Sequence, residues 1–387
     1  MTTAYIVDAL RTAGGRRKGR LASIHPADLA ARALDGIVAR TGLDPAAIDD
    51  VIMGCVTQGG EQTGQIGRNA VLASKLPITV PAVTIDRQCG SSQQAVQFAA
   101  QAVMSGTQDI VIAAGIESMT RVPMGSTATL YDKAGIGTGP WSEAILQRFG
   151  IKAFSQFHGA QMIADKYGFK REELDSFALK SHRNGVAANQ RGDFAREILP
   201  VALEGGAVHD TDEGMRADAS LEALAALEPI MPGGSITAGN ASQMCDGAAA
   251  VLIVSEAALK THGLKPLARI DNLTVTAGDP VIMLEEPINA TRRALERAGR
   301  KLDAIDLYEV NEAFAPIPMA WLSALNADPK RLNVNGGAIA LGHPLGASGA
   351  KLMATLVHAL HTRNKRYGLQ TMCEGGGIAN VTIIERL

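Results

Sequence analysis

The sequence has no excess of either charge, no long apolar run and no closely spaced cysteines. Its 387 residues hold 37 Lys and Arg against 39 Asp and Glu, so the net charge is −2. This balance argues against nucleic acid or a membrane surface as a partner held by bulk charge. No apolar run reaches the length of a membrane span, and the first residues lack the basic and apolar regions of a secretion signal. We therefore expect a cytoplasmic protein.

The cysteines are few and widely separated. None of them forms a Cys-x-x-Cys pair; they are Cys55, Cys89, Cys245 and Cys373. This spacing argues against both a disulfide framework and a zinc site, so we expect no metal. The chain is otherwise an ordinary globular one, 46% apolar and 20% charged, and it is long enough for two or three domains around a large core.

One stretch combines a strand, a tight turn and an apolar helix. Residues 81–85 are apolar and largely β-branched, which predicts a buried strand, and residues 91–104 have apolar side chains at helical spacing. Cys89 lies in the turn between them. The N–H groups of a helix start favour a thiolate and lower a thiol's pKa, so Cys89 is a candidate reactive thiol. Most free cysteines are instead small core residues, and this position is compatible with both interpretations.

The remaining pattern alternates between strands and helices on either side of a less regular region. Strands are predicted at 4–7, 51–56, 109–115, 248–254, 307–310, 369–373 and 381–384, and helices at 26–40, 68–76, 256–261, 287–298 and 348–360. The basic, Gly-rich residues 11–20 are interpreted as a solvated loop, with the steering of a phosphorylated ligand as the alternative.

Residues 119–242 lack this alternation. Gly, Pro, Ser and aromatic residues are scattered up to residue 157, two polar helices follow near 160–167 and 171–191, and another is expected at 221–227. This composition indicates an insertion or lid over the core. We expect three parts: residues 1–118 with 243–265 as the N-terminal half, 119–242 as a loop domain, and 266–387 as the C-terminal half.

The C-terminal half repeats the N-terminal half. Ala47-Ile48-Asp49 recurs 257 residues later as Ala304-Ile305-Asp306, and at the same offset Ser91 matches Ser348 and Glu117 matches Glu374. We infer two βαβ-rich halves related by a pseudo-twofold axis. The two helices that begin at the matched serines carry few charges, which indicates a middle layer between two sheets.

Three further residues that can carry chemistry lie in a loop or at strand ends of the second half. His343 stands between Gly342 and Pro344 in a Gly-rich loop that the repeat places opposite Cys89, so we distinguish it from the other histidines as a base. Asn311 ends one predicted strand and Cys373 ends another, at the carboxyl edge where α/β sheets build sites.

These residues resemble the four active-site motifs of the thiolase family. The matching stretches are Gln88-Cys89-Gly90-Ser91-Ser92, Asn311-Glu312-Ala313-Phe314, the Gly-Gly-Ala-Ile-Ala-Leu-Gly-His-Pro run that contains His343, and Met372-Cys373-Glu374-Gly375-Gly376-Gly377. The match is collinear over the whole chain. It implies an α/β fold with five αβαβα layers and a loop domain over the site. It also implies coenzyme A (CoA) thioesters as substrates, a homodimer or homotetramer, and no cofactor beyond CoA as co-substrate.

The resemblance also implies a role for each residue in cleaving a 3-ketoacyl-CoA. Cys89 would attack the keto carbon while His343 takes its proton, and Cys373 would move a proton at the acetyl α-carbon. His343 and a water held by Asn311 would steady the thioester oxygen, and the N–H groups of Cys89 and Gly375 would form a second oxyanion hole. Ser242 would touch the pantetheine arm, or else be a plain turn residue. Arg216 is a candidate for the CoA phosphates.

Departures from the family pattern affect the acyl specificity. Residues 155–161 lack the His-Met-Gly pattern of acetoacetyl-specific biosynthetic members, and Ala347 and Lys351 replace the usual Cys and Arg near His343 but outside the chemistry. A biosynthetic, acetoacetyl-CoA-forming thiolase is therefore an alternative. A ketoacyl synthase would use one cysteine, so Cys373 argues against it. A thiolase-like lipid-binding protein without activity would not need every catalytic residue type that this chain has.

Overall fold

Apolar segments from both halves of the chain pair into one mixed β-sheet in the computed structural model, which describes residues 2–387. The strands run in the order β4-β3-β5-β9-β1-β10-β13-β12-β11. Their bounds are β1 (Ala4–Thr12), β3 (Asp50–Gly54), β4 (Ala82–Ile85), β5 (Ile110–Ser118), β9 (Cys245–Ser255), β10 (Ala268–Ala277), β11 (Leu307–Val310), β12 (Tyr367–Glu374) and β13 (Ile378–Arg386). The pairs β3–β4, β3–β5 and β11–β12 are parallel, and the others along this path are antiparallel.

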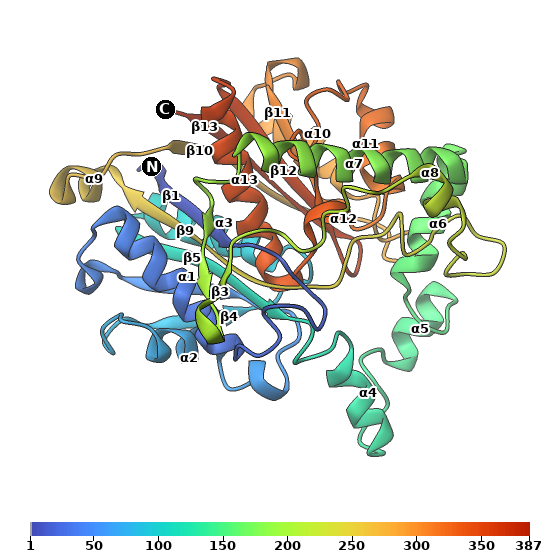
Figure 1. Cartoon of the computed structure of the whole chain (residues 1–387), viewed down its shortest axis with the longest axis horizontal. Helices are drawn as coiled ribbons and strands as arrows, with labels where there is room; N and C mark the ends of the chain where they lie inside the picture. Colours follow the sequence, from blue (N-terminus) through green and yellow to red (C-terminus); the bar gives the residue numbers. More distant parts are fainter. Residues whose placement is uncertain (1) are drawn as a thin grey trace.

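Helices cover the outer faces of the sheet and fill the space between its two halves (Figure 1). On the N-terminal half, α1 (Pro26–Thr41) and α2 (Ile66–Ala73) pack against β3, β5 and β9. On the C-terminal half, α10 (Pro287–Ala298) lies over β10, β12 and β13, and α11 (Pro316–Leu325) packs beside α10 and meets β11 through Trp321 and Tyr308. Between the two halves lie α3 (Ser91–Ser105) and α13 (Ser348–Thr362). The expected five-layer αβαβα fold is therefore confirmed.

The middle layer is built from small side chains that let two helices approach closely. The residues of α13 are buried from Ser348 through Leu360. At Gly349 a Cβ atom would stand 2.0 Å from the backbone nitrogen of Gln93, so α3 and α13 touch backbone to backbone. Buried amides on α3 also bind the far half, because Gln93 Nε2 donates to the carbonyl of Gln370 at 3.1 Å. The prediction that these helices are covered on every side is confirmed for α13, whereas α3 exposes Phe98 and Gln101 toward its C-terminal end.

The internal repeat appears as matched elements in the two halves. Ser91 and Ser348 open α3 and α13, and the short 3₁₀ helices η1 (Pro45–Ala47) and η4 (Leu302–Ala304) occupy equivalent places before β3 and β11. Glu117 and Glu374 lie at the ends of β5 and β12. The Glu117 carboxylate accepts the N–H of Gly346 at 2.8 Å, which ties one half to a loop of the other.

The inserted region takes the place of a tight turn. In the second half, β12 and β13 are joined by Gly375, Gly376 and Gly377, whereas the equivalent β5 and β9 are joined through residues 119–244. This region contains α4 (Ser126–Lys133), α5 (Glu143–Phe149), α6 (Gln156–Tyr167), α7 (Arg171–Arg191), α8 (Leu221–Ala225), the short strands β6 (Ile198–Leu199), β7 (Val201–Ala202) and β8 (Val208–His209), and the 3₁₀ turn η3 (Glu204–Gly206). Figure 1 shows α4 and α5 extending away from the body of the molecule. The three-part division of the chain stays a prediction.

The remaining elements are short. They are β2 (Gly15–Arg16), which pairs with β9, α9 (Glu256–His262), α12 (Ala338–Leu341), and the 3₁₀ turns η2 (Gly60–Gln62) and η5 (Leu345–Ala347). No helix within residues 2–387 combines the length and apolarity that a bilayer crossing requires. The cytoplasmic location stays a prediction.

Candidate active site

Cys89 lies in a constrained turn between β4 and α3. Gln88 has φ of +49°, a left-handed conformation that is costly for a residue with a side chain. The hydroxyl of Ser91 holds this turn, since it donates to the carbonyl of Gln88 at 2.6 Å and accepts the N–H of Arg87 at 2.9 Å. The predicted position of Cys89 just before the helix is therefore confirmed.

The prediction that this position lowers the pKa of Cys89 is wrong. The side chain is only 3% exposed and packs with Met119, Leu345, Leu352 and Met372. Burial raises the pKa of Cys89 to about 12, and the neighbouring Glu374 carboxyl adds to the effect. Loss of solvation thus outweighs the dipole of α3. Cys89 rests as a neutral thiol near pH 7 and needs a base before it can act as a nucleophile.

His343 is buried in the loop between α12 and α13, and its hydrogen bonds identify the basic nitrogen. Its Nδ1 lies 2.5 Å from the hydroxyl of Ser348. That hydroxyl already donates its single proton to the carbonyl of Pro344 at 2.8 Å, so it must accept from Nδ1–H. The amide nitrogen of Asn311 lies 3.4 Å from Nε2. The network therefore assigns the proton to Nδ1 and leaves the lone pair on Nε2.

The surroundings of His343 keep it unprotonated. Burial lowers its pKa to about 3, and the positive charge of Lys351 acts in the same direction. At neutral pH the imidazole is therefore free to accept a proton.

Asn311 follows the end of β11 and has one free oxygen. Its amide nitrogen faces His343, whereas its buried Oδ1 has no hydrogen-bond partner within residues 2–387. The next residue, Glu312, anchors this segment by accepting from Ser181 at 2.6 Å and from Asn333 at 2.8 Å. An orphaned buried oxygen of this kind suits a bound water.

Cys373 and Gly375 stand at the other side of the Cys89 turn. Cys373 lies in β12 and is buried, which raises its pKa well above the ordinary value, with an additional effect from Cys89 nearby. A Cβ atom on Gly375 would meet the side chain of Gln88 at 2.9 Å, so this loop lies directly against the turn. Within residues 2–387 no acceptor is found for the backbone N–H of Cys89 or of Gly375. Both N–H groups remain available to a ligand oxygen.

A cavity of about 650 Å³ reaches His343 from the surface. Its wall is rich in methionine, with Met119, Met124, Met215 and Met244, and it includes Phe157 and Phe314. Ser242 lines it and donates its N–H to the carbonyl of Ala313 at 2.9 Å. Arg216 lines it as well. The structure thus brings both predicted CoA-contact residues to the cavity that contains the predicted base.

The basic loop at residues 11–20 is not simply solvated. Arg11 belongs to β1 and is fully buried, with its guanidinium paired to Asp212 and Glu197. Arg16 and Arg17 line the cavity, so the alternative of a cationic wall for a phosphorylated ligand fits these two residues. Sequence reasoning also missed Ser348 as the partner of His343, although its position five residues after the histidine was visible.

A second cavity of about 680 Å³ lies against α1. Its wall includes Arg32, Val38, Lys75 and Leu199, and neither cysteine nor histidine is among the described residues that line it. We therefore place the chemistry at the cavity that holds His343.

Family models match nearly the whole chain. The model described as "Thiolase, N-terminal domain" matches residues 4–257, and the model described as "Thiolase, C-terminal domain" matches residues 264–386.

Individual proteins match over the full length. The steroid 3-ketoacyl-CoA thiolase FadA6 of Mycobacterium tuberculosis is 53% identical over 389 residues, covering 100% of this chain and 95% of the relative. The 3-oxoadipyl-CoA/3-oxo-5,6-dehydrosuberyl-CoA thiolase of Escherichia coli is 42% identical over 403 residues, covering 100% of both. Among solved structures, the acetyl-CoA acetyltransferase of Bacillus anthracis superposes with a TM-score of 0.92 at 35% identity, covering 100% of this chain and 99% of that one.

Proposed function

The chain belongs to the thiolase family, and we propose that it cleaves 3-ketoacyl-CoA with free CoA to give acetyl-CoA and a shortened acyl-CoA. It is an acyltransferase enzyme. The observation that carries the proposal is the pairing of His343, which lines the cavity, with Asn311, because an unprotonated Nε2 and an orphaned amide oxygen match a base and a water site.

The first step forms a bond between the Cys89 sulfur and the keto carbon. His343 Nε2 takes the thiol proton, which a thiol with a raised pKa does not release by itself. The carbonyl oxygen becomes an oxyanion, and the free N–H groups of Cys89 and Gly375 stabilise it.

The second step breaks the bond between the α- and β-carbons. The electron pair moves onto the thioester as the enolate of acetyl-CoA, whose oxygen is held by His343 and by a water on Asn311. The Cys373 thiol gives its proton to the α-carbon, so acetyl-CoA leaves and the acyl group stays on Cys89.

The third step returns the enzyme to its starting state. A fresh CoA thiol loses its proton to the Cys373 thiolate, attacks the acyl carbon and displaces the Cys89 sulfur. Cys89 then recovers its proton from His343. Run in reverse, the same groups condense two thioesters.

The walls of the cavity fit a CoA thioester with an acyl group longer than acetoacetyl. Arg16, Arg17 and Arg216 supply positive charge for the CoA phosphates. Methionine side chains adapt to irregular apolar shapes, and Met119 and Met124 lie on the wall with Ile230 and Phe157. A relative at 53% identity is named for steroid substrates, which supports a bulky acyl group.

Thiolysis of a chain-length series tests both parts of the proposal. We expect the purified enzyme to consume acetoacetyl-CoA and 3-ketooctanoyl-CoA when free CoA is added, and Cys89→Ala to consume neither. No thiolysis of any member would contradict the function. A kcat/KM that falls more than about a hundredfold (~2.7 kcal/mol) from the four-carbon to the eight-carbon substrate would contradict the acyl class alone.

We also propose that the enzyme is at least a dimer. β4 pairs with β3 on one side and is the last strand of the sheet, so its other edge is open within the described residues. An open edge with apolar side chains favours pairing with a second strand.

A further inference from the structure

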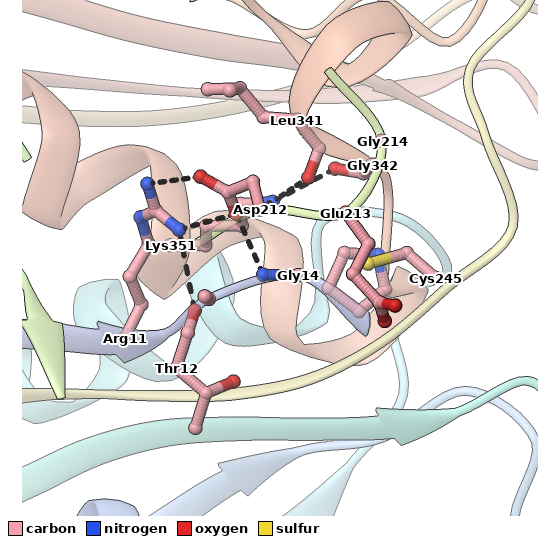
Figure 2. Close-up of polar contacts among 12 residues, drawn as sticks. Arg11, Thr12, Gly14, Asp212, Glu213, Gly214, Cys245, Leu341, Gly342 and Lys351 are labelled. Carbon is pink, nitrogen blue, oxygen red and sulfur yellow. Dashed lines mark hydrogen bonds and ion pairs between the residues drawn. The ribbon is translucent and has the colours of Figure 1, made fainter. Parts of the chain in front are cut away.

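Lys351 is a buried cation directly behind the catalytic loop. It lies on the first turn of α13 and is 4% exposed. Its Nζ donates to the carbonyl of Leu341 at 2.5 Å and to the carbonyl of Gly342 at 3.1 Å (Figure 2). These are the two carbonyls that immediately precede His343. The ammonium group of Lys351 thus reaches the C-terminal end of α12 and binds two carbonyls that this helix leaves unpaired.

The backbone at Gly342 is held from a second side. Its φ of +81° with ψ of 159° is a conformation that only glycine adopts readily. A Cβ atom there would stand 2.6 Å from the sulfur of Cys245. Cys245 and Lys351 together therefore fix the peptide that leads into His343.

The charge of Lys351 is balanced by a buried cluster that joins three parts of the chain. Its Nζ lies 3.8 Å from Asp212, which binds the guanidinium of Arg11 at 2.8 and 3.0 Å and accepts the N–H of Gly14 at 2.6 Å. Glu197 accepts from Arg11 at 2.6 Å and from Thr355 at 2.9 Å. Arg11 belongs to β1, Asp212 and Glu197 to the inserted region, and Lys351 to α13. Two cations thus face two anions, with no net charge.

We propose that Lys351 is a positioning residue for His343: its ammonium group fixes the carbonyls of Leu341 and Gly342, and its charge disfavours a second charge on the imidazole. This inference rests on the proposed function, since it takes His343 as the base that accepts the Cys89 proton. It gives the buried ion cluster a use beyond stability, because the cluster holds the ammonium in place.

The sign of the charge effect follows from what surrounds the imidazole. Its hydrogen-bond partners Asn311 and Ser348 are uncharged, and Lys351 is the charged group whose field lowers its pKa. Lys351 itself faces Asp212, Glu197, Arg11 and the Cys245 thiol. Removing its charge therefore raises the pKa of His343, and the fraction of unprotonated base near pH 3 falls.

Three substitutions separate the hydrogen bonds from the charge. Lys351→Arg keeps both, Lys351→Gln keeps a donor without the charge, and Lys351→Met keeps neither. We expect the arginine variant to retain kcat within about threefold. We expect the methionine variant to lose about 10- to 100-fold in kcat with KM within about twofold, since a small displacement of a catalytic group costs up to about 10² in rate.

The pH profile supplies a readout that a merely structural role would not change. Because the pKa of His343 is about 3, the comparison has to reach that pH: the ratio of kcat/KM at pH 3 to that at pH 8 should fall about twofold in the glutamine variant, equivalent to about half a pKa unit on His343. It should stay at the wild-type value in the arginine variant. Lys260→Met, which removes a lysine that pairs with Glu256 on α9, outside both the cluster and the His343 loop, should leave both kcat and this ratio unchanged.

The outcomes are distinguishable from failure of the proposed function. Wild-type enzyme without thiolysis activity contradicts that function. The role of Lys351 is overturned if the wild-type enzyme is active and a folded methionine or glutamine variant keeps the wild-type kcat and the wild-type pH ratio. Thermal unfolding of each variant reports whether it folds, and if Lys351→Met does not, Lys351→Gln and its pH ratio decide the question.

Discussion

Cys89 and Cys373 are both buried, and the pKa of each is raised, yet the proposed mechanism uses them differently. Acylation of Cys89 by acetyl-CoA needs the nucleophile, the oxyanion hole at Cys89 and Gly375, and His343, which takes the Cys89 proton and passes it to the departing CoA sulfur. No carbon–carbon bond breaks in this exchange, so Cys373 never becomes a thiolate and takes no part in moving the proton. Making or breaking a carbon–carbon bond also needs a proton to move at the α-carbon, which is the step given to Cys373. The two reactions can therefore be measured separately.

Cys373→Ser should separate exchange from thiolysis. We expect the variant to exchange labelled CoA with acetyl-CoA at close to the wild-type rate. Thiolysis of acetoacetyl-CoA should fall by about 10² to 10⁴, the usual contribution of general acid–base catalysis. Cys89→Ser is the matched control and should lose both activities, because a hydroxyl is a much weaker nucleophile. Equal losses of exchange and thiolysis in Cys373→Ser would show that Cys373 only packs.

At the residue scale, sequence predicted where in the fold the candidate side chains lie but not how their environment alters them. Motifs located Cys89, His343, Asn311 and Cys373, whose roles stay a proposal. The sequence predicts a lowered pKa for Cys89, whereas the structure raises it, because the cost of burial depends on side chains such as Leu352 that are far away in the sequence. The sequence likewise gives no sign that Lys351 affects the catalytic loop, since its contacts with Leu341 and Gly342 depend on how α13 packs against the loop that contains His343.

At the scale of elements, the contact between α3 and α13 decides how closely the two halves approach. A Cβ atom on Gly349 would overlap the backbone nitrogen of Gln93, which cannot move aside as a flexible side chain could. A Cβ atom on Gly185 in α7 would stand 3.3 Å from a methyl carbon of Leu341, which is a side-chain atom that can shift. Substitution by alanine would therefore meet rigid backbone at Gly349 and movable side chains at Gly185.

Gly349→Ala should destabilise the protein and Gly185→Ala should not. Overpacking of a tight backbone contact typically costs about 1–3 kcal/mol. At Gly185 the better helix propensity of alanine, about 1 kcal/mol, offsets a small adjustment of Leu341. We expect the midpoint of thermal unfolding to fall by about 1–4 °C in the first variant and to change by less than about 1 °C in the second. Similar midpoints for both variants would contradict a backbone-to-backbone contact in the middle layer.

Periodicity located most elements, and the exceptions have identifiable causes. The bounds of α7, α10 and β11 match the prediction to the residue. β10 was not predicted because Asp271, Asn272 and Thr274 interrupt its apolar alternation. The helix α11 was hidden by Pro316 and Pro318, which break a helix in its interior but are tolerated here in the first turn, where backbone N–H groups lack partners. The helices α4 and α5 have no buried face, so no apolar period marked them.

At the scale of the whole molecule, the open edge of β4 lies within an apolar surface. Val83 on β4 is 39% exposed, and Ile78 just before the strand is 76% exposed. Edge strands in proteins that stay monomeric usually carry charges or are covered. The first charge after β4 is Asp86, beyond the strand end at Ile85. A second copy of the same edge, related by a twofold axis, would satisfy the unpaired backbone groups and cover these side chains.

Val83→Lys should therefore weaken self-association. In a twofold pairing each copy would bring its lysine close to the same residue of the other, so like charges would meet where apolar side chains had packed. We expect light scattering at micromolar concentration to give at least a dimer mass for the wild type and a smaller mass for Val83→Lys. Leu221→Lys is the control, because Leu221 is also exposed, at 48%, but lies on α8 in the inserted region, away from β4. It should leave the mass unchanged. A monomer mass for the wild type, or an equal loss of mass in both variants, would reject pairing through this edge.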